Sequence, residues 1–326
     1  MSAALAELSV DRRGGVFLDA YLAPFARWLA REEVTELLVN RPGELWIEAA
    51  GEPALRRFEA ADVDDQLIRR LAEQIARASH QGVNREQPLV AATLPDGARA
   101  QFVAPSATRG HWAMAIRRHR LVDLPLDVYA GAIAPPARLA APDALRDPIA
   151  FLRHAVAHRR TILVSGGTSS GKTTFLNALL AEVPPAERVV LVEDTPEIRL
   201  RSESGVGLVA VKGETGEARV TTDDLLQASL RLRPDRIVLG ELRGREAVSF
   251  LRAINTGHPG SLSTIHANSP SGALEQLALM VMQAGLGLGR ADTIAYARSM
   301  IDVVVQLERR EGRRTIAAIE DIGGDR

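Results

Sequence analysis

Hydrophobic residues follow two different patterns in the first third of the chain. Five of them recur at helical spacing behind an acidic start and predict an amphipathic helix: Val63, Leu67, Ile68, Leu71 and Ile75. Short alternating segments at residues 44–48, 98–104 and 112–117 predict strands around this helix. We therefore expect residues 1–123 to form a smaller N-terminal α+β domain.

The pattern changes after a run rich in alanine and proline, residues 124–146, which is typical of an interdomain linker. Asp147-Pro148 then predicts a helix start, because an acidic N-cap and a proline at the first helical position both favour it. Strands and helices alternate beyond it, with strands expected over 161–165, 188–193, 236–240 and 261–265, and helices from about Gly171, near 222–232 and near 245–255. Buried strands separated by helices imply a largely parallel sheet covered on both faces, so residues 147–326 should form an α/β domain. Its last expected element is a hairpin, in which residues 301–307 and 314–319 flank Glu311-Gly312.

Composition and charge narrow the classes of function. The chain of 326 residues is 46% hydrophobic and 25% charged, with a net charge of −1, so no global field favours nucleic acid or anionic lipid. The absence of cysteine excludes a disulfide scaffold, a thiolate metal site and a cysteine nucleophile. The first 12 residues do not resemble a secretory signal, and the most apolar stretch, 277–289, falls short of the roughly 20 residues that cross a bilayer. We expect a cytoplasmic protein with no integral membrane segment, peripheral to a membrane at most.

The strongest chemical signal is a glycine-rich loop between an apolar strand and a helix-forming segment. Residues 166–173 match the pattern G-x-x-x-x-G-K-[ST], whose glycines let backbone amides point at phosphate oxygens. Lys172 is expected to reach the β and γ phosphates of a nucleotide, and Thr173 to bind Mg²⁺. Only two of the 40 basic residues are lysines, so the position of Lys172 is itself informative. The predicted phosphate-binding residues are Gly166, Gly167, Thr168, Ser169, Ser170, Gly171, Lys172, Thr173 and Thr174.

Two other expected strands end in acids. The strand that begins at Arg236 ends in Glu241, and we expect it to lie beside the P-loop strand and to deliver this carboxylate to the magnesium and its waters. The strand before it is followed by Glu193, Asp194 and Glu197, and either Glu193 or Glu197 could polarise the attacking water. A solvated loop with a helix cap is the competing interpretation of these acids.

Two histidines and two arginines complete the set of candidates. His258 and His266 flank a short strand, and a histidine near a triphosphate can donate to the γ-phosphate; ordinary hydrogen-bonded histidines are the alternative. Arg99 and Arg117 lie in the N-terminal region, where mobile arginines could complete a P-loop site as fingers. The competing interpretation is that both are exposed cations on a solvated face.

Four segments in one order resemble the Walker A, Asp box, Walker B and His box of the secretion traffic ATPases: Gly-Gly-Thr-Ser-Ser-Gly-Lys-Thr-Thr at 166–174, Glu-Asp-Thr-Pro-Glu at 193–197, Leu-Arg-Pro-Asp-Arg-Ile-Val-Leu-Gly-Glu-Leu-Arg-Gly at 232–244, and Asn-Thr-Gly-His-Pro-Gly at 255–260 with Thr-Ile-His-Ala-Asn at 264–268. The chain most resembles the hexameric ATPase of bacterial type IV secretion systems, also called the P-type DNA transfer ATPase. The resemblance is close from residue 147 onward and looser before it.

This resemblance implies a RecA-like P-loop ATPase domain behind a smaller N-terminal domain, six chains in a ring, and ATP with Mg²⁺ as cofactors. It implies that Lys172 binds phosphate, that Thr173 and Glu241 serve the metal, and that Glu197 or Glu193 is the catalytic acid. By the same resemblance, His258 and His266 contact the γ-phosphate, and Arg99 and Arg117 reach the nucleotide. Because Glu241 stands where many P-loop enzymes have aspartate, a water-mediated metal contact is expected there. The implied partners are inner-membrane components of a secretion channel and a protein or DNA cargo.

Several alternatives remain open on the sequence. A type IV pilus or type II secretion motor belongs to the same superfamily, but type II ATPases usually carry a four-cysteine zinc module, and pilus motors normally lack the Gly-His-Pro-Gly found at 257–260. A GTPase would need Asn-Lys-x-Asp, which the two lysines, Lys172 and Lys212, do not provide. A nucleotide kinase would phosphorylate a small acceptor, and a non-catalytic assembly or DNA-binding module would bind ATP without releasing phosphate.

Overall fold

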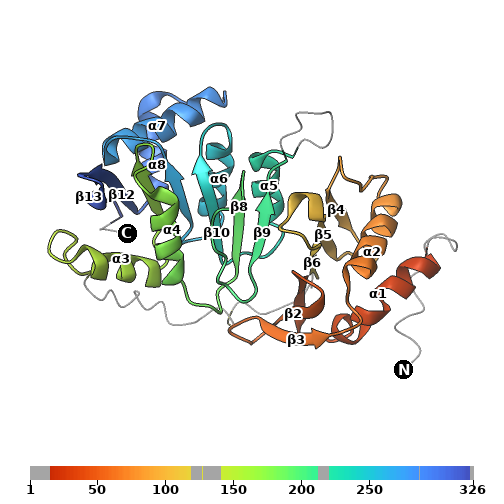
Figure 1. The fold of residues 1–326 in the computed structure, drawn as a ribbon. Helices are drawn as coiled ribbons and strands as arrows, with labels where there is room; N and C mark the ends of the chain where they lie inside the picture. The colour runs from red at the N-terminus through yellow and green to blue at the C-terminus, as the bar shows by residue number, and fades with distance from the viewer. Residues whose placement is uncertain (1–14, 119–126, 128–140, 212–219, 286, 324–326) are drawn as a thin grey trace.

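The computed structural model describes residues 15–118, 127, 141–211, 220–285 and 287–323. Residues 15–118, here called the N-terminal unit, and residues 141–323, the C-terminal unit, each contain one sheet with its own helices (Figure 1). Most of the predicted linker at 124–146 lies outside the described residues, so the proposed domain boundaries stay a prediction. None of the helices in the described part of the chain has both the length and the apolarity that a bilayer crossing requires.

The N-terminal unit is an antiparallel sheet of six strands in the order β3-β2-β1-β6-β5-β4. Its elements are α1 (Gly15–Leu29), β1 (Val34–Val39), β2 (Gly43–Ala49), β3 (Arg56–Ala60), α2 (Asp65–Ala78), β4 (Leu89–Thr93), β5 (Arg99–Val103), the 3₁₀ turn η1 (Pro105–Ala107) and β6 (Ala113–Arg117). The predicted amphipathic helix is α2, which begins where the Asp64 side chain accepts from the Leu67 amide and which buries Ile68, Leu71 and Ile75. The three strands predicted in this region are confirmed as β2, β5 and β6.

The C-terminal unit is a seven-stranded sheet in the order β13-β12-β7-β11-β10-β8-β9, parallel except for β13. Its elements are α3 (Pro148–Ala157), β7 (Ile162–Gly166), α4 (Lys172–Ala181), β8 (Val189–Glu193), β9 (Val206–Val209), α5 (Thr222–Ser229), β10 (Arg236–Leu242), α6 (Glu246–Asn255), β11 (Leu262–Ile265), α7 (Pro270–Gln283), α8 (Arg290–Met300), β12 (Val303–Arg310) and β13 (Arg313–Asp321). The predicted α/β class, the parallel sheet and the closing hairpin are confirmed.

One expectation about this sheet is wrong. We expected β10, which ends near Glu241, to lie beside the P-loop strand β7, but β11 lies between them and pairs with both. Since β7, β11 and β10 are parallel, their carboxyl ends still meet at one edge of the sheet, and Glu241 still faces the P-loop side.

Apolar clusters lie on both faces of the C-terminal sheet. One face packs against α3 and α4 through residues such as Phe151 and Leu176, and the other against α5, α6 and α7 through residues such as Leu226, Phe250 and Leu277. Strands buried on both faces are nearly continuous apolar runs, as β7 and β8 are here. The helices thus enclose the sheet and leave its carboxyl edge available for a site.

The two units share a hydrophobic interface beside β9, the edge strand of the C-terminal sheet (Figure 1). Side chains alternate along β1, so that Leu37 packs in the core of the N-terminal unit while Leu38 joins the cluster that contains Leu208 of β9. Polar contacts flank this interface: Arg233 Nη2 lies 2.5 Å from Glu48 Oε1, and Asn40 Nδ2 donates to the Ser204 carbonyl at 2.9 Å. The N-terminal unit is therefore docked by both apolar burial and charge pairing.

Candidate active site

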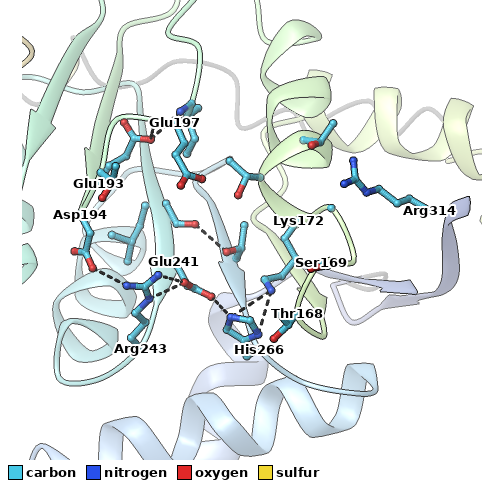
Figure 2. Close-up of a pocket in the computed structure, with 18 residues that line it drawn as sticks. Thr168, Ser169, Lys172, Glu193, Asp194, Glu197, Glu241, Arg243, His266 and Arg314 are labelled. Carbon is cyan, nitrogen blue, oxygen red and sulfur yellow. Dashed lines mark hydrogen bonds and ion pairs between the residues drawn. The ribbon is translucent and has the colours of Figure 1, made fainter. Parts of the chain in front are cut away.

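A cavity of about 600 Å³ opens at the carboxyl edge of the C-terminal sheet, where ligands bind in open parallel sheets (Figure 2). The P-loop after β7 forms one wall, and the ends of β8, β10 and β11 form the others. The lining residues are Thr168, Ser169, Gly171, Lys172, Thr173, Thr174, Glu193, Asp194, Thr195, Glu197, Ile198, Leu239, Gly240, Glu241, Arg243, Thr264, His266 and Arg314.

The P-loop has the backbone that its glycines predict. Gly171 precedes α4 in the left-handed region, with φ of +92°, and Ser169 has φ of +61°. These conformations turn the chain into the first turn of α4, where the helix N-terminus directs unpaired amides and a partial positive charge outward. The loop can therefore receive an anion with several negative charges.

Lys172 is buried at the base of the loop. Its Nζ donates to the Gly166 carbonyl at 3.0 Å and lies 3.2 Å from Nδ1 of His266. Burial lowers the pKa of the Lys172 ammonium, and the nearby Glu241 carboxylate opposes that shift. An ammonium that has lost much of its hydration gains more from a phosphate anion than an exposed one would.

A chain of charged contacts runs from Lys172 across the floor of the cavity (Figure 2). Nε2 of His266 lies 2.7 Å from Glu241 Oε1, while Arg243 donates from Nε to Glu241 Oε2 at 2.6 Å. Arg243 also donates from Nη1 to Asp194 Oδ2 at 2.9 Å. The structure thus brings together His266, Glu241 and Lys172, three residues with an expected role in the sequence, and links them to Arg243 and Asp194, which had none.

The two glutamates after β8 have different surroundings. Glu193 is 3% exposed, and its Oε1 accepts from the backbone amides of Glu197 at 3.0 Å and Ile198 at 2.8 Å. Its Oε2 accepts from Arg109 of the N-terminal unit. Glu197 is exposed, and its side chain points into the cavity from the loop that Glu193 holds (Figure 2).

His258 does not line the cavity. It precedes β11, and the parallel pairing of Leu262 with Ile162 and of Ile265 with Ser165 places the start of β11 at the edge opposite the P-loop. There its Nδ1 lies 2.8 Å from the Ala253 carbonyl at the end of α6. The structure therefore separates His258 from His266, although the two residues are only eight positions apart in the sequence.

Arg99 and Arg117 are brought together, but not at the cavity. They are directly opposite each other on β5 and β6 of the N-terminal sheet. Nε of Arg117 lies 3.4 Å from Glu36 Oε1, and neither arginine lines the cavity of its own chain.

Four residues of the site escaped the sequence analysis as individual candidates: Asp194, Arg243, Arg314 and Arg109. Arg243 stands two positions after Glu241, so an arginine beside the strand-end acid was the available signal. Arg314 comes from β13 and packs against the P-loop, since a Cβ on Gly171 would lie 2.6 Å from Arg314 Cδ. Neither Arg314 nor Arg109 has a local pattern that reveals its position, because distant chain segments bring them to the site.

The fold and the site define a P-loop nucleotide-binding protein: a parallel α/β sheet, a glycine-rich loop at a helix start, and strand-end acids at the same edge. Residues 136–314 match the family described as Type II/IV secretion system protein. The chain belongs to this family. The resemblance to secretion traffic ATPases is thereby confirmed.

Individual relatives point to type IV secretion. The chain is 39% identical over 328 residues to the type IV secretion system protein PtlH of Bordetella pertussis, covering 96% of each chain. It is 35% identical over 276 residues to VirB11 of Bartonella henselae, covering 76% of this chain and 78% of that one. Among solved structures, it is similar to the VirB11 ATPase of the Brucella suis type IV secretion system in complex with sulphate, with a TM-score of 0.85, 32% identity, and coverage of 95% of this chain and 96% of that one.

Proposed function

We propose that this protein hydrolyses ATP to ADP and phosphate with Mg²⁺ and powers a type IV secretion or conjugation machine. One observation carries the proposal: Lys172, Glu241 and Glu197 converge on one cavity behind a P-loop whose backbone is shaped for phosphate. The relatives named VirB11, PtlH and, for conjugal transfer, TrbB support the choice of machine.

The residues present fit a magnesium nucleotide. Positive φ at Ser169 and Gly171 opens the loop toward the cavity, and the buried Lys172 supplies a cation. The Thr173 hydroxyl and the Glu241 carboxylate are oxygen donors of the kind that Mg²⁺ prefers, with Glu241 acting through water. When bound, the metal neutralises charge that develops on the phosphate oxygens.

We assign the water-orienting role to Glu197. Both oxygens of Glu193 are engaged, one by Arg109 and the other by two backbone amides, so Glu193 has little capacity left to accept a proton from water. Glu197 lines the cavity, and within the described part of the chain its carboxylate accepts no such hydrogen bond. Both ring nitrogens of His266 face charged groups, Nε2 the Glu241 carboxylate and Nδ1 the Lys172 ammonium, so we propose that His266 contacts the γ-phosphate only once Lys172 has turned toward the phosphates.

The arginines point to a multi-chain site. Among the described residues, all those lining the cavity belong to the C-terminal unit, while Arg99 and Arg117 lie together on the N-terminal sheet. We propose that they reach a nucleotide when chains assemble into a homohexameric ring, or when the N-terminal unit moves. We assign no nucleotide contact to His258 within its own chain, because it lies at the opposite edge of the sheet.

The proposed setting is the cytoplasmic side of the inner membrane, where the ring would be peripheral and would dock on membrane components of the channel. Domain motion during hydrolysis would do mechanical work on that channel, with protein or DNA cargo handled indirectly. The relatives' names are the support for this setting.

Phosphate release and nucleotide binding test the proposal on purified protein, with light scattering in the presence and absence of ATP to size the assembly. Lys172→Ala should abolish turnover, whereas Glu241→Gln should bind a fluorescent ATP analogue and fail to hydrolyse ATP. Arg290→Ala, which removes a surface ion pair with Glu275 outside the cavity, is the control and should keep the wild-type rate. An unchanged rate in well-folded Lys172→Ala would refute the assignment.

A further inference from the structure

We propose that Arg109 is a positioning residue, through which the docking of the N-terminal unit sets the location of Glu197. The inference rests on the proposed function, since it concerns the carboxylate that we assign to the attacking water. It follows from contacts that join the loop after η1 to the end of β8.

Arg109 crosses from the N-terminal unit to the wall of the cavity. Its Nη2 donates to Glu193 Oε2 and, at 2.7 Å, to the Ile198 carbonyl. Its backbone amide donates to the Gly207 carbonyl of β9 at 3.2 Å, and the neighbouring Thr108 forms an antiparallel bridge with Leu208. The segment is thus anchored on β9 by its backbone, and its guanidinium reaches residues that line the cavity.

Glu193 connects Arg109 to the loop that carries Glu197. One carboxylate oxygen binds Arg109, and the other accepts from the amides of Glu197 and Ile198. A charge-assisted acceptor for two successive amides restrains the loop at the residue whose side chain enters the cavity. Without Arg109, the buried Glu193 carboxylate would lose its cation, and it would be driven to turn toward water and release those amides.

Gly207 leaves the space that Arg109 occupies. A Cβ at this position would lie 2.6 Å from Arg109 Cδ and 2.7 Å from its Nε. Gly207 does not have positive φ, so alanine fits its backbone and acts by displacing the arginine. Gly207→Ala therefore perturbs the same contact from the opposite side without removing a charge.

The remaining polar contacts at the interface provide a matched control. Glu48 is bound by Arg233, and this arginine–carboxylate pair also joins the two units, but neither residue lines the cavity. Glu48→Gln should loosen docking to a similar degree while leaving Glu193 and its amides in place. If looser docking alone lowers activity, Glu48→Gln and the variants that perturb Arg109 should both lose activity. If Arg109 positions Glu197, only the variants that perturb Arg109 should lose activity.

The test measures steady-state ATP hydrolysis and backbone amide exchange on the full-length protein. For Arg109→Gln and Gly207→Ala we expect kcat to fall about tenfold with KM within about twofold of wild type, because the loop serves the chemical step. Amide exchange at Glu197 and Ile198 should quicken about tenfold in both variants, and Glu48→Gln should change neither kcat nor this exchange by more than about twofold. Arg109→Lys should recover part of kcat, since an ammonium can pair with Glu193 but lacks the planar guanidinium whose Nη2 donates to both Glu193 and the Ile198 carbonyl.

The outcomes separate this inference from the proposed function. If wild type hydrolyses ATP, and the Arg109 and Gly207 variants match Glu48→Gln in kcat and in exchange, the inference is overturned and the proposed function stands. If wild type releases no phosphate, both are overturned. Should Arg109→Gln fail to fold, Gly207→Ala alone decides, because it retains every charged group.

Discussion

The buried carboxyl of Glu36 should make the free energy of unfolding depend on pH, and Glu36→Gln should remove most of this dependence. Glu36 lies on β1, on the side that faces the C-terminal unit, and is 5% exposed. Burial raises its pKa to about 7, and Arg117 only partly opposes this shift. The other charged groups that act on it are Glu48, Arg233 and Arg188, and within the described part of the chain Glu36 Oε2 and Arg188 Nη2 lack hydrogen-bond partners.

The size and sign of the effect follow from linkage. The ordinary pKa of glutamate is 4.5, so a folded value of about 7 corresponds to about 3 kcal/mol at ~1.4 kcal/mol per pKa unit. Because the folded state holds this proton more tightly than the unfolded state, the contribution is fully present below pH 4.5 and is lost as the pH rises to about 7. Burial lowers the pKa of Arg188 to about 9, and ionised Glu36 favours the charged form of this arginine. Because Glu36→Gln removes this favourable interaction as well, it will reduce the pH dependence of the unfolding free energy by less than about 3 kcal/mol.

Urea unfolding of wild type and Glu36→Gln at pH 5 and pH 8 measures this difference. We expect wild type to lose about 1 to 3 kcal/mol more unfolding free energy over this interval than the variant loses. Glu59→Gln removes an exposed carboxylate from β3 and should follow wild type, which controls for the loss of one negative charge. Equal pH dependence of wild type and Glu36→Gln would refute the reasoning.

Three further predictions test the site and the core. Gly171→Ala should weaken nucleotide binding about tenfold or more in a fluorescence titration, because its φ of +92° disfavours a side chain and its Cβ would meet Arg314. Arg314→Ala should raise KM for ATP with kcat nearly unchanged if this arginine, which lines the cavity, contributes to binding alone; a fall in kcat at constant KM would contradict that role. Phe102→Ala should lower the unfolding free energy measured in urea by about 3 to 5 kcal/mol, because Phe102 is fully buried in the N-terminal core. A loss below about 1 kcal/mol would contradict this prediction and would mean that neighbouring core residues fill the space left by the ring.

Elements with a local signal could be predicted from the sequence. Asp147 does cap α3 by accepting from the Ala150 amide, with Pro148 at the first helical position. The hairpin of β12 and β13 turns at Glu311 and Gly312, with φ of +51° and +80°. In each case, residues adjacent in the chain set the backbone angles, so nearby sequence was sufficient.

Other elements were not predicted because their patterns are ambiguous. β1 is buried along nearly its whole length, since one face packs in the N-terminal core and the other against the C-terminal unit, and this erases the usual alternation. β9 has only four residues, and its place at the sheet edge depends on pairing with β8. Helices α1 and α8 and strands β3 and β4 were likewise not predicted.

The amino-acid sequence by itself determined the position of the phosphate loop, the parallel α/β class of the C-terminal sheet and the presence of acids at the ends of β8 and β10. Each of these depends on residue spacing within a short segment. Tertiary structure alone decided which side chains meet: Arg243 with Asp194, and Arg109 with Glu193. It also decided that His258 lies at the other edge of the sheet. Such contacts depend on the order of the strands in the sheet and on how the two units dock. The local sequence around each contacting residue encodes neither of these.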